Sequence, residues 1–236
     1  MFEFKKVKKM FELHIANKNY SSWSLRAWIL MKQLEIPFYE RKHLFSGKTT
    51  KDEFHKFSPS STVPCLVDGN TTVWDSLAIA EYLGESFSVW PKDKKARAFG
   101  RSAAAEMHAS FSNLRRQCPM SCGIRVKMAV VDELLTADLK RIDELWQQGI
   151  DHFGGPFLVG QSFSAADAFF CPVAFRVQTY GLIMSDSAME YAFRLLDLPF
   201  MRQWYDDALK EQSRDDGDDR AALLHKTLVA DYRAKA

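Results

Sequence analysis

A run of hydroxyl side chains lies where one hydrophobic periodicity changes into another, at Tyr20-Ser21-Ser22-Trp23-Ser24-Leu25-Arg26. Before it, Leu13 and Ile15 alternate with polar neighbours over residues 11–16, which predicts a half-buried strand. After it, apolar residues recur at the three- and four-residue spacing of an amphipathic helix, at Ala27, Leu30, Met31 and Leu34. The run therefore marks a strand-to-helix corner, whose helix would pack on a sheet.

Such a corner is suited to holding an anion. The first backbone N–H groups of a helix have no partner within the helix, and the helix dipole makes this end electropositive. A serine here either caps the helix or donates a hydrogen bond to a bound anion such as a thiolate. Ser21, Ser22 and Ser24 are candidates for both roles.

The next segment continues the α/β pattern. Residues 58–70 predict a loop, a short strand and a hairpin turn, because Asp-Gly and Gly-Asn pairs tolerate positive φ. A second strand is expected at residues 71–74. Asp75 is then placed to cap a helix that begins at Ser76. That helix has its apolar positions at Leu77, Ile79, Ala80 and Leu83.

Beyond a polar, proline-marked linker at residues 88–95, no strand-like alternation is found, so we expect the rest to be helical. One long helix is predicted from about Lys94 until Pro119 stops it. Its apolar face consists of Phe99, Ala103, Met107, Phe111 and Leu114. Another helix has Leu135, Leu139, Ile142, Trp146 and Ile150 on one face. A third, at residues 165–180, is apolar nearly all round and should form the centre of this half, with Ser164 and Asp167 as a capping box.

Composition excludes several classes of protein. With 236 residues, 47% of them hydrophobic, the chain can build packed globular cores. The 32 basic and 30 acidic residues leave a net charge of +2, which gives no overall field for nucleic acid. No apolar run approaches the roughly 20 residues that span a bilayer. The basic residues 1–10 lack the apolar core of a signal peptide, so we expect a solvated extension and a cytoplasmic location.

The cysteines indicate free thiols and no metal site. Neither C-x-x-C spacing nor the histidine partners of a zinc site accompany Cys65, Cys118, Cys122 and Cys171. Cys118 and Cys122, four residues apart around Pro119, leave a redox pair open as the alternative to ordinary buried packing.

Three motifs, in this order, resemble the cytosolic glutathione S-transferase family: S-x-x-S-x-R after the first strand, V-P-x-L before the hairpin and D-S-L-A-I-A-E-Y-L after it. Residues 157–167 are also similar to the family's G-x-x-x-S-x-A-D segment. The resemblance implies an α/β thioredoxin-like N-terminal domain at residues 11–89, preceded by the extension at 1–10. It implies an all-α C-terminal domain at residues 90–236, homodimerisation and a detoxifying transferase.

The resemblance also implies how glutathione binds. Only a thiolate attacks electrophiles efficiently, so the site must stabilise the anion; Ser21 is the expected catalytic donor, with Ser22 as the fallback. The peptide groups of Val63, beside a cis Pro64, would pair with the cysteinyl part. Ser76 and Asp75 would bind the γ-glutamyl end. For the glycyl carboxylate the sequence offers Lys48, Lys51, His55 and Lys56.

The second substrate is expected between the domains, where aromatic and methionine residues suit a hydrophobic electrophile. The candidates are Trp23, Met107, His108, Phe111 and Arg115. The alternative is that Met107 and Phe111 are core and His108 faces solvent. Arg176 and Tyr180 either reach the floor of the cleft or make structural contacts.

Two alternatives to the transferase function remain open. The S-S-x-S pattern resembles the zeta group, which includes maleylacetoacetate isomerases, although Trp23 replaces a cysteine and Thr179 a substrate-binding arginine of those enzymes. A non-catalytic glutathione- or ligand-binding protein is the other, since one fold serves many functions. A dehydroascorbate reductase would need a cysteine at Ser21.

Overall fold

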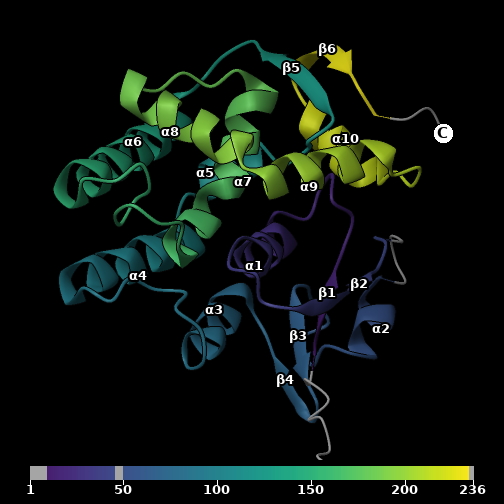
Figure 1. Ribbon diagram of the computed structural model, residues 1–236. Helices are drawn as coiled ribbons and strands as arrows, with labels where there is room; N and C mark the ends of the chain where they lie inside the picture. Colours follow the sequence, from purple (N-terminus) through teal and green to yellow (C-terminus); the bar gives the residue numbers. More distant parts are fainter. Residues whose placement is uncertain (1–9, 46–49, 234–236) are drawn as a thin grey trace, which may run out of the picture.

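A mixed four-stranded sheet forms the base of the N-terminal half in the computed structural model, which describes residues 10–45 and 50–233 (Figure 1). The strands are β1 (Phe11–Ile15), β2 (Phe38–Lys42), β3 (Cys65–Asp68) and β4 (Thr71–Val73), in the order β2-β1-β3-β4. β1 runs parallel to β2 and antiparallel to β3, with Leu13 opposite Leu66, and β3 and β4 form the expected hairpin. This is the predicted thioredoxin-like sheet.

The helices of this half are α1 (Ser22–Gln33), α2 (Thr50–His55) and α3 (Ser76–Gly84). Two of them, α1 and α3, begin where the sequence predicts, and the third, α2, was not predicted. α1 starts inside the hydroxyl run and buries Leu25, Trp28 and Ile29 completely. Asp75 caps α3, because its Oδ1 accepts a hydrogen bond from the Leu77 N–H at 2.9 Å.

Helices α4 to α10 make up most of the second half. They are α4 (Lys94–Ala109), α5 (Ser112–Gln117), α6 (Glu133–Phe153), α7 (Ala165–Tyr180), α8 (Asp186–Asp197), α9 (Pro199–Lys210) and α10 (Asp216–Leu223). α7 is buried over almost its whole length, and α1, α4 and α8 pack on it, which confirms the predicted central helix. The capping box is also confirmed, since the Ser164 N–H donates to Asp167 Oδ2 at 2.8 Å and the Ser164 side chain accepts from a backbone N–H of the first turn.

The single long helix predicted from Lys94 to Pro119 is wrong, because it is broken into α4 and α5. Ser110 is extended, and Phe111 adopts the left-handed conformation with φ of 60°. The Arg115 side chain folds back from α5 and donates to the carbonyl oxygens of Met107 and His108, at 3.1 and 3.3 Å, and of Ser110. These contacts satisfy carbonyls that the end of α4 leaves without helical partners.

The second half is predominantly helical, as predicted, but it also contains a small sheet that the sequence pattern did not predict. β5 (Ile124–Met128) and β6 (Lys226–Asp231) form a two-stranded antiparallel sheet, in which Ile124 and Val126 face the core. The two strands lie about 100 residues apart in the chain, so local periodicity contains no sign that they pair. Among the helices that the structure describes, none combines the length and apolarity needed to cross a bilayer.

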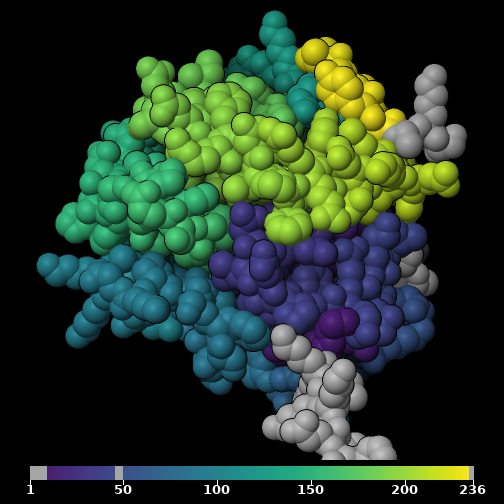
Figure 2. Space-filling view, in the orientation of Figure 1, coloured from purple at the N-terminus to yellow at the C-terminus, as the bar shows by residue number. Residues whose placement is uncertain are grey.

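The two halves are in direct contact. Figure 2 shows the segments of α9 and α10, in yellow-green, lying against the purple and blue start of the chain. The Lys18 ammonium is buried at this contact, 2.8 Å from Asp207 and 3.0 Å from Glu40. It also lies over the rings of Trp28 and Trp204, with 4.8 and 5.3 Å to the centroids. The segment that enters the hydroxyl run is therefore anchored by both halves.

Candidate active site

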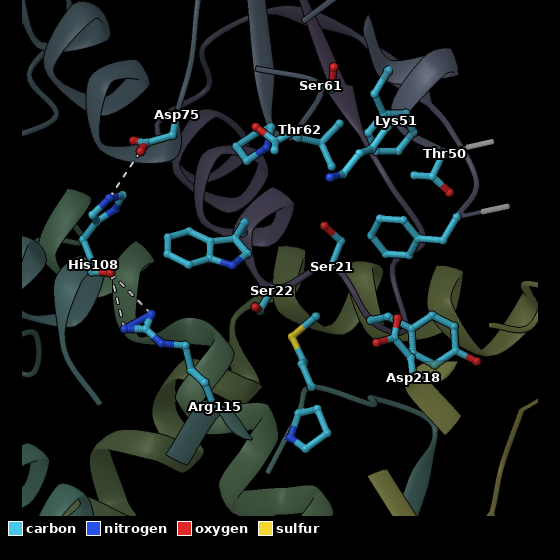
Figure 3. A pocket seen from close by; sticks show the side chains of 18 of the residues that line it. Ser21, Ser22, Thr50, Lys51, Ser61, Thr62, Asp75, His108, Arg115 and Asp218 are labelled. Atoms are coloured by element: carbon cyan, nitrogen blue, oxygen red, sulfur yellow. Dashed lines mark hydrogen bonds and ion pairs between the residues drawn. The ribbon is translucent and has the colours of Figure 1, made fainter. Parts of the chain in front are cut away.

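A cavity of about 710 Å³ opens at the hydroxyl run, between the two halves. From the N-terminal half its wall includes residues 20–23, residues 61–64 and Asp75. From the other half it includes His108, Arg115, Pro119, Met120 and Arg176. Figure 3 shows Ser21 on the side of Thr62 and Lys51, and Ser22 on the side of Arg115. Both serines thus face the same cavity from slightly different directions.

Ser21 is the N-cap residue of α1, but its side chain makes no capping hydrogen bond. Its Oγ donates to Ser24 Oγ at 2.7 Å, and Ser24 Oγ accepts from the Ala16 N–H at 3.2 Å. Ser24 is fully buried, so it fixes the position of the Ser21 oxygen at the cavity wall. The Ser22 hydroxyl has no hydrogen-bond partner in the described part of the chain. The capping role considered for Ser21 is therefore not found.

The loop before Ser21 is held by the far end of the chain. The buried Glu211 carboxylate accepts hydrogen bonds from the backbone N–H groups of Lys18, at 2.8 Å, and Asn19, at 3.2 Å. Asn19 Nδ2 donates to the Ala208 carbonyl at 2.5 Å, and Asn19 Oδ1 accepts from the Gly123 N–H at 3.2 Å. Glu211 thus serves as a positioning residue for the hydroxyl run, and nothing in its local sequence indicates this role.

We expect Glu211→Gln to lower the free energy of unfolding by about 1 to 2 kcal/mol. The amide keeps the shape of the side chain, but one of its two acceptor oxygens is replaced by a donor that faces backbone N–H groups. Urea unfolding followed by tryptophan fluorescence measures the change. Glu190→Gln on the exposed side of α8 is the matched control and should be neutral. Equal stability of the two variants would contradict the positioning role.

Tyr20 also lines the cavity, but its phenol is already engaged. The hydroxyl donates to Asp219 at 3.0 Å and accepts from Arg233 at 3.1 Å. Burial, together with the negative charge of Asp219, raises the pKa of Tyr20 well above its usual value. This phenol is not free to donate to a thiolate, whereas the serines beside it face the cavity.

The loop before β3 presents an open peptide edge to the cavity. The Val63–Pro64 bond is cis, as expected. None of the described hydrogen bonds uses the N–H or the C=O of Val63. A peptide lying extended along this edge can pair with both groups as a strand would.

The start of α3 supplies a buried hydroxyl and a carboxylate. Ser76 is 1% exposed, and its Oγ has no hydrogen-bond partner among the described residues. Asp75 Oδ2 lies 3.2 Å from His108 Nε2 on α4. Burial, assisted by the charges of Arg26 and Arg115, lowers the pKa of His108, so the imidazole is neutral at neutral pH. The contact therefore joins a neutral imidazole and a carboxylate at the cavity wall.

Of the four residues offered for a glycyl carboxylate, Lys51 lines the cavity. His55 Nδ1 lies 3.3 Å from Ser61 Oγ, and Lys56 pairs with Glu53 on the surface at 2.7 Å. Lys48 lies outside the described residues. Lys51 is the candidate that the geometry supports.

The candidates for the second substrate separate into two groups. Trp23, His108 and Arg115 line the cavity, as predicted. Met107 and Phe111 are buried in the hydrophobic core and are absent from the cavity wall, which fits the alternative considered for them. The break at Phe111 explains the difference, because it directs the chain away from the expected helix face. Tyr180 is structural, since its hydroxyl donates to the Pro119 carbonyl at 2.7 Å.

The four cysteines are buried free thiols. Cys118 Sγ contacts Met128 Sδ at 3.8 Å, whereas Cys122 Sγ donates to the Lys18 carbonyl at 3.4 Å. Burial raises the pKa of the Cys118 thiol to about 12. These contacts fit ordinary buried packing and do not support the redox pair.

Comparisons with known proteins agree with this geometry. The family model for the glutathione S-transferase N-terminal domain matches residues 20–86. A probable maleylacetoacetate isomerase of Vibrio cholerae is 28% identical over 200 residues, which is 78% of this chain and 89% of that protein. The human glutathione S-transferase theta-1 is 32% identical over 153 residues, covering 59% of this chain and 62% of the relative.

Solved structures show the same fold. The theta class glutathione S-transferase of Xanthomonas axonopodis pv. citri, solved with glutathione bound, superposes with a TM-score of 0.61 at 17% identity. The match covers 84% of this chain and 97% of that one, so both halves are included. Because the family model fits the segment with the serines and Pro64, and the relatives match through both halves, this chain is similar in sequence and in fold to the cytosolic glutathione S-transferases.

Proposed function

We propose that the protein binds glutathione in this cavity and activates its thiol for attack on a small electrophile. The observation that carries the proposal is that Ser21, the open peptide edge of Val63 and Asp75 line one cavity, with the buried, partnerless hydroxyl of Ser76 directly after Asp75. The spacing of the three along the chain resembles that of the family motifs. The Val63 peptide groups and the Ser76 hydroxyl lack partners that the corresponding parts of glutathione would supply.

Ser21 is the proposed donor to the thiolate. Its hydroxyl hydrogen points to Ser24 Oγ in the empty protein, and rotation about the C–O bond turns it toward the cavity. Ser24 can then donate its own hydrogen to Ser21 Oγ while it still accepts from Ala16. A chain of hydrogen bonds that ends on the sulfur strengthens the last of them. The N-terminus of α1 adds its dipole.

The energy required is modest. Lowering the pKa of a thiol by two units takes about 2.7 kcal/mol. One or two charge-assisted hydrogen bonds together with a helix N-terminus supply about this amount. The thiolate sulfur then forms a bond to an electrophilic carbon, and the leaving group departs with the electron pair of the bond that breaks.

The ends of the tripeptide have separate partners. Val63 would pair with the cysteinyl peptide groups, and Ser76 would donate its buried hydroxyl to the γ-glutamyl carboxylate. Asp75 would attract the ammonium group, although its Oδ2 already lies 3.2 Å from His108 Nε2. Lys51 would pair with the glycyl carboxylate. These contacts hold the thiol next to Ser21 without contributing to its ionisation.

A glutathione-dependent isomerase is the second candidate. The Vibrio cholerae relative, named a probable maleylacetoacetate isomerase, favours it, together with the S-S-x-S pattern. Thr179, which stands where those isomerases have an arginine, is buried and donates to the Ser121 carbonyl at 2.7 Å. The residue is thus part of the packing of α7 and takes no part in the cavity, so transfer remains the first proposal.

One panel of substrates tests the proposal. Turnover is measured with and without glutathione for chlorodinitrobenzene, an organic hydroperoxide and a maleyl ketone. We expect glutathione-dependent turnover of at least one, and isomerisation of the ketone alone would favour the second candidate. Failure of the protein to bind glutathione in calorimetry would overturn both.

The protein is expected to be a symmetric homodimer. The motivation is the family resemblance together with the apolar residues of segments 77–83 and 99–114, which would form an isologous interface. Light scattering at micromolar concentration should give about twice the chain mass of 27.1 kDa. A mass near that of one chain would contradict this prediction.

A further inference from the structure

Three arginine side chains lie close together, two in the cavity wall and one directly behind it. Arg26 comes from α1, Arg115 from α5 and Arg176 from α7. The guanidinium groups of Arg26 and Arg115 lie over the same Trp23 ring, at 4.2 and 5.3 Å from its centroid. Arg115 and Arg176 line the cavity, and Arg26 lies behind Trp23. The positive charges therefore concentrate in one region of the wall.

None of the three forms an ion pair with a carboxylate in the described part of the chain. Arg115 donates to carbonyl oxygens at the end of α4. Arg176 donates through Nε to the Cys118 carbonyl at 2.8 Å, and its buried Nη1 has no partner. Arg26 Nε and Nη1 are also buried without partners. Unpaired buried charge is costly, so this arrangement calls for an anion.

Of the three arginines, Arg176 is the best placed to bind such an anion. It is only 3% exposed, yet it belongs to the cavity wall. Burial lowers the pKa of its guanidinium to about 10, so the group is still charged at neutral pH. The guanidinium groups of Arg176 and of the neighbouring Arg115 provide N–H donors of the planar kind that bind carboxylates well.

Glutathione does not need these arginines. In the proposed function its own anionic groups are met by Lys51, Ser76 and Ser21. The cavity's two carboxylates do not neutralise the arginines either, because Asp75 is engaged by His108 and the Leu77 N–H. Asp218 lies at the opposite end of the view from Arg115 (Figure 3).

We propose that the second substrate is an electrophile that carries a carboxylate, and that Arg176 and Arg115 bind this group while Trp23 and Met120 contact its apolar part. The inference rests on the proposed function and narrows its substrate class. It makes Arg176 a specificity-determining residue, whereas the sequence left open a purely structural role for it.

A matched pair of substrates tests this directly. 4-Chloro-3,5-dinitrobenzoate and its methyl ester share the reacting carbon and differ in the charge of one group. Replacing Arg176 with glutamine should lower kcat/KM for the acid by about tenfold or more, since a charge-assisted hydrogen bond is lost. The value for the ester should change by about twofold at most. Arg176→Lys keeps the charge and should recover part of the loss.

Arg202→Gln is the control, because Arg202 is an exposed arginine of α9 that pairs with Asp197 at 2.9 Å. It should leave both substrates unaffected. An equal loss for acid and ester in Arg176→Gln would show that Arg176 acts only on folding, and no change for either would exclude it from the site. Both results overturn the inference.

A binding measurement on the unaltered protein requires neither turnover nor a variant. The glutathione conjugates of the acid and of the ester are titrated by calorimetry. We expect the acid conjugate to bind about tenfold more tightly, with an advantage that shrinks at high salt. Equal affinities would overturn the inference and leave the proposed function intact. If neither conjugate nor glutathione binds, the proposed function itself fails.

Discussion

Replacing Ser21 with alanine is expected to leave glutathione bound but to raise the pKa of its thiol by one unit or more. Ser21 Oγ is the oxygen that Ser24 holds at the cavity wall, whereas the contacts of Val63, Ser76 and Lys51 with the peptide do not involve it. Turnover should fall by about tenfold for each unit if the thiolate is the reacting form. The ultraviolet absorbance of the bound thiolate, followed against pH, measures the shift.

Three further variants make this test specific. Ser22→Ala should have the smaller effect, because Ser22 faces the Arg115 side of the cavity (Figure 3). Ser24→Ala should give an intermediate loss, since it removes only the group that positions Ser21. Ser21→Cys should permit a mixed disulfide with glutathione and shift the chemistry toward thiol transfer.

Two results would contradict the assignment of Ser21 as the donor to the thiolate. If Ser22→Ala abolishes the thiolate signal and Ser21→Ala keeps it, the donor is Ser22. If neither variant changes the signal, the backbone N–H groups at the start of α1 stabilise the thiolate.

Asp167→Ala is expected to lower the free energy of unfolding by about 3 to 5 kcal/mol, because each buried donor left without a partner costs about 1 to 3 kcal/mol. The carboxylate accepts four hydrogen bonds: from the Leu158 N–H at 2.9 Å, the Ser164 N–H at 2.8 Å, the Ser164 hydroxyl at 3.0 Å and the Tyr191 hydroxyl at 2.8 Å. A helix cap alone is worth about 1 to 2 kcal/mol. The larger loss is expected because these buried donors would be left without partners. Urea unfolding gives the value.

Tyr191→Phe is the matched control, because it removes one of these hydrogen bonds and keeps the ring. It should cost about 1 kcal/mol. The folded fraction of Asp167→Ala should bind glutathione with nearly unchanged affinity, since Asp167 is absent from the cavity wall. A large loss of affinity at an unchanged melting temperature would show that the residue belongs to the site.

The structural features that depend on local sequence were predicted correctly. The strand-to-helix corner before α1, the Asp75 cap of α3 and the capping box of α7 all depend on residues within a few positions of one another. The serines, Val63 and Asp75 were placed at one cavity because the order of the motifs resembles a known arrangement. Propensity, periodicity and capping act over this short range, so one sequence suffices to predict them.

The failures depend on contacts that the local apolar pattern does not report. The break at Phe111 ends a continuous apolar pattern, and a side chain from the next helix satisfies the carbonyls it exposes. β5 and β6 pair across about 100 residues, and no local period reports such a pairing.

The residues of the site also divide into those that local sequence predicts and those that only tertiary contacts place. The sequence by itself determined the hydroxyl run, the loop before β3 and the cap of α3, because each is a local pattern. Only the tertiary structure decided that Glu211, 192 residues from Asn19, holds the loop before Ser21. It also selected Lys51 and brought Arg176 into the cavity wall while Met107 went to the core. Which side chains meet there depends on how helices of the second half pack against the first, and that packing is not encoded in any one segment.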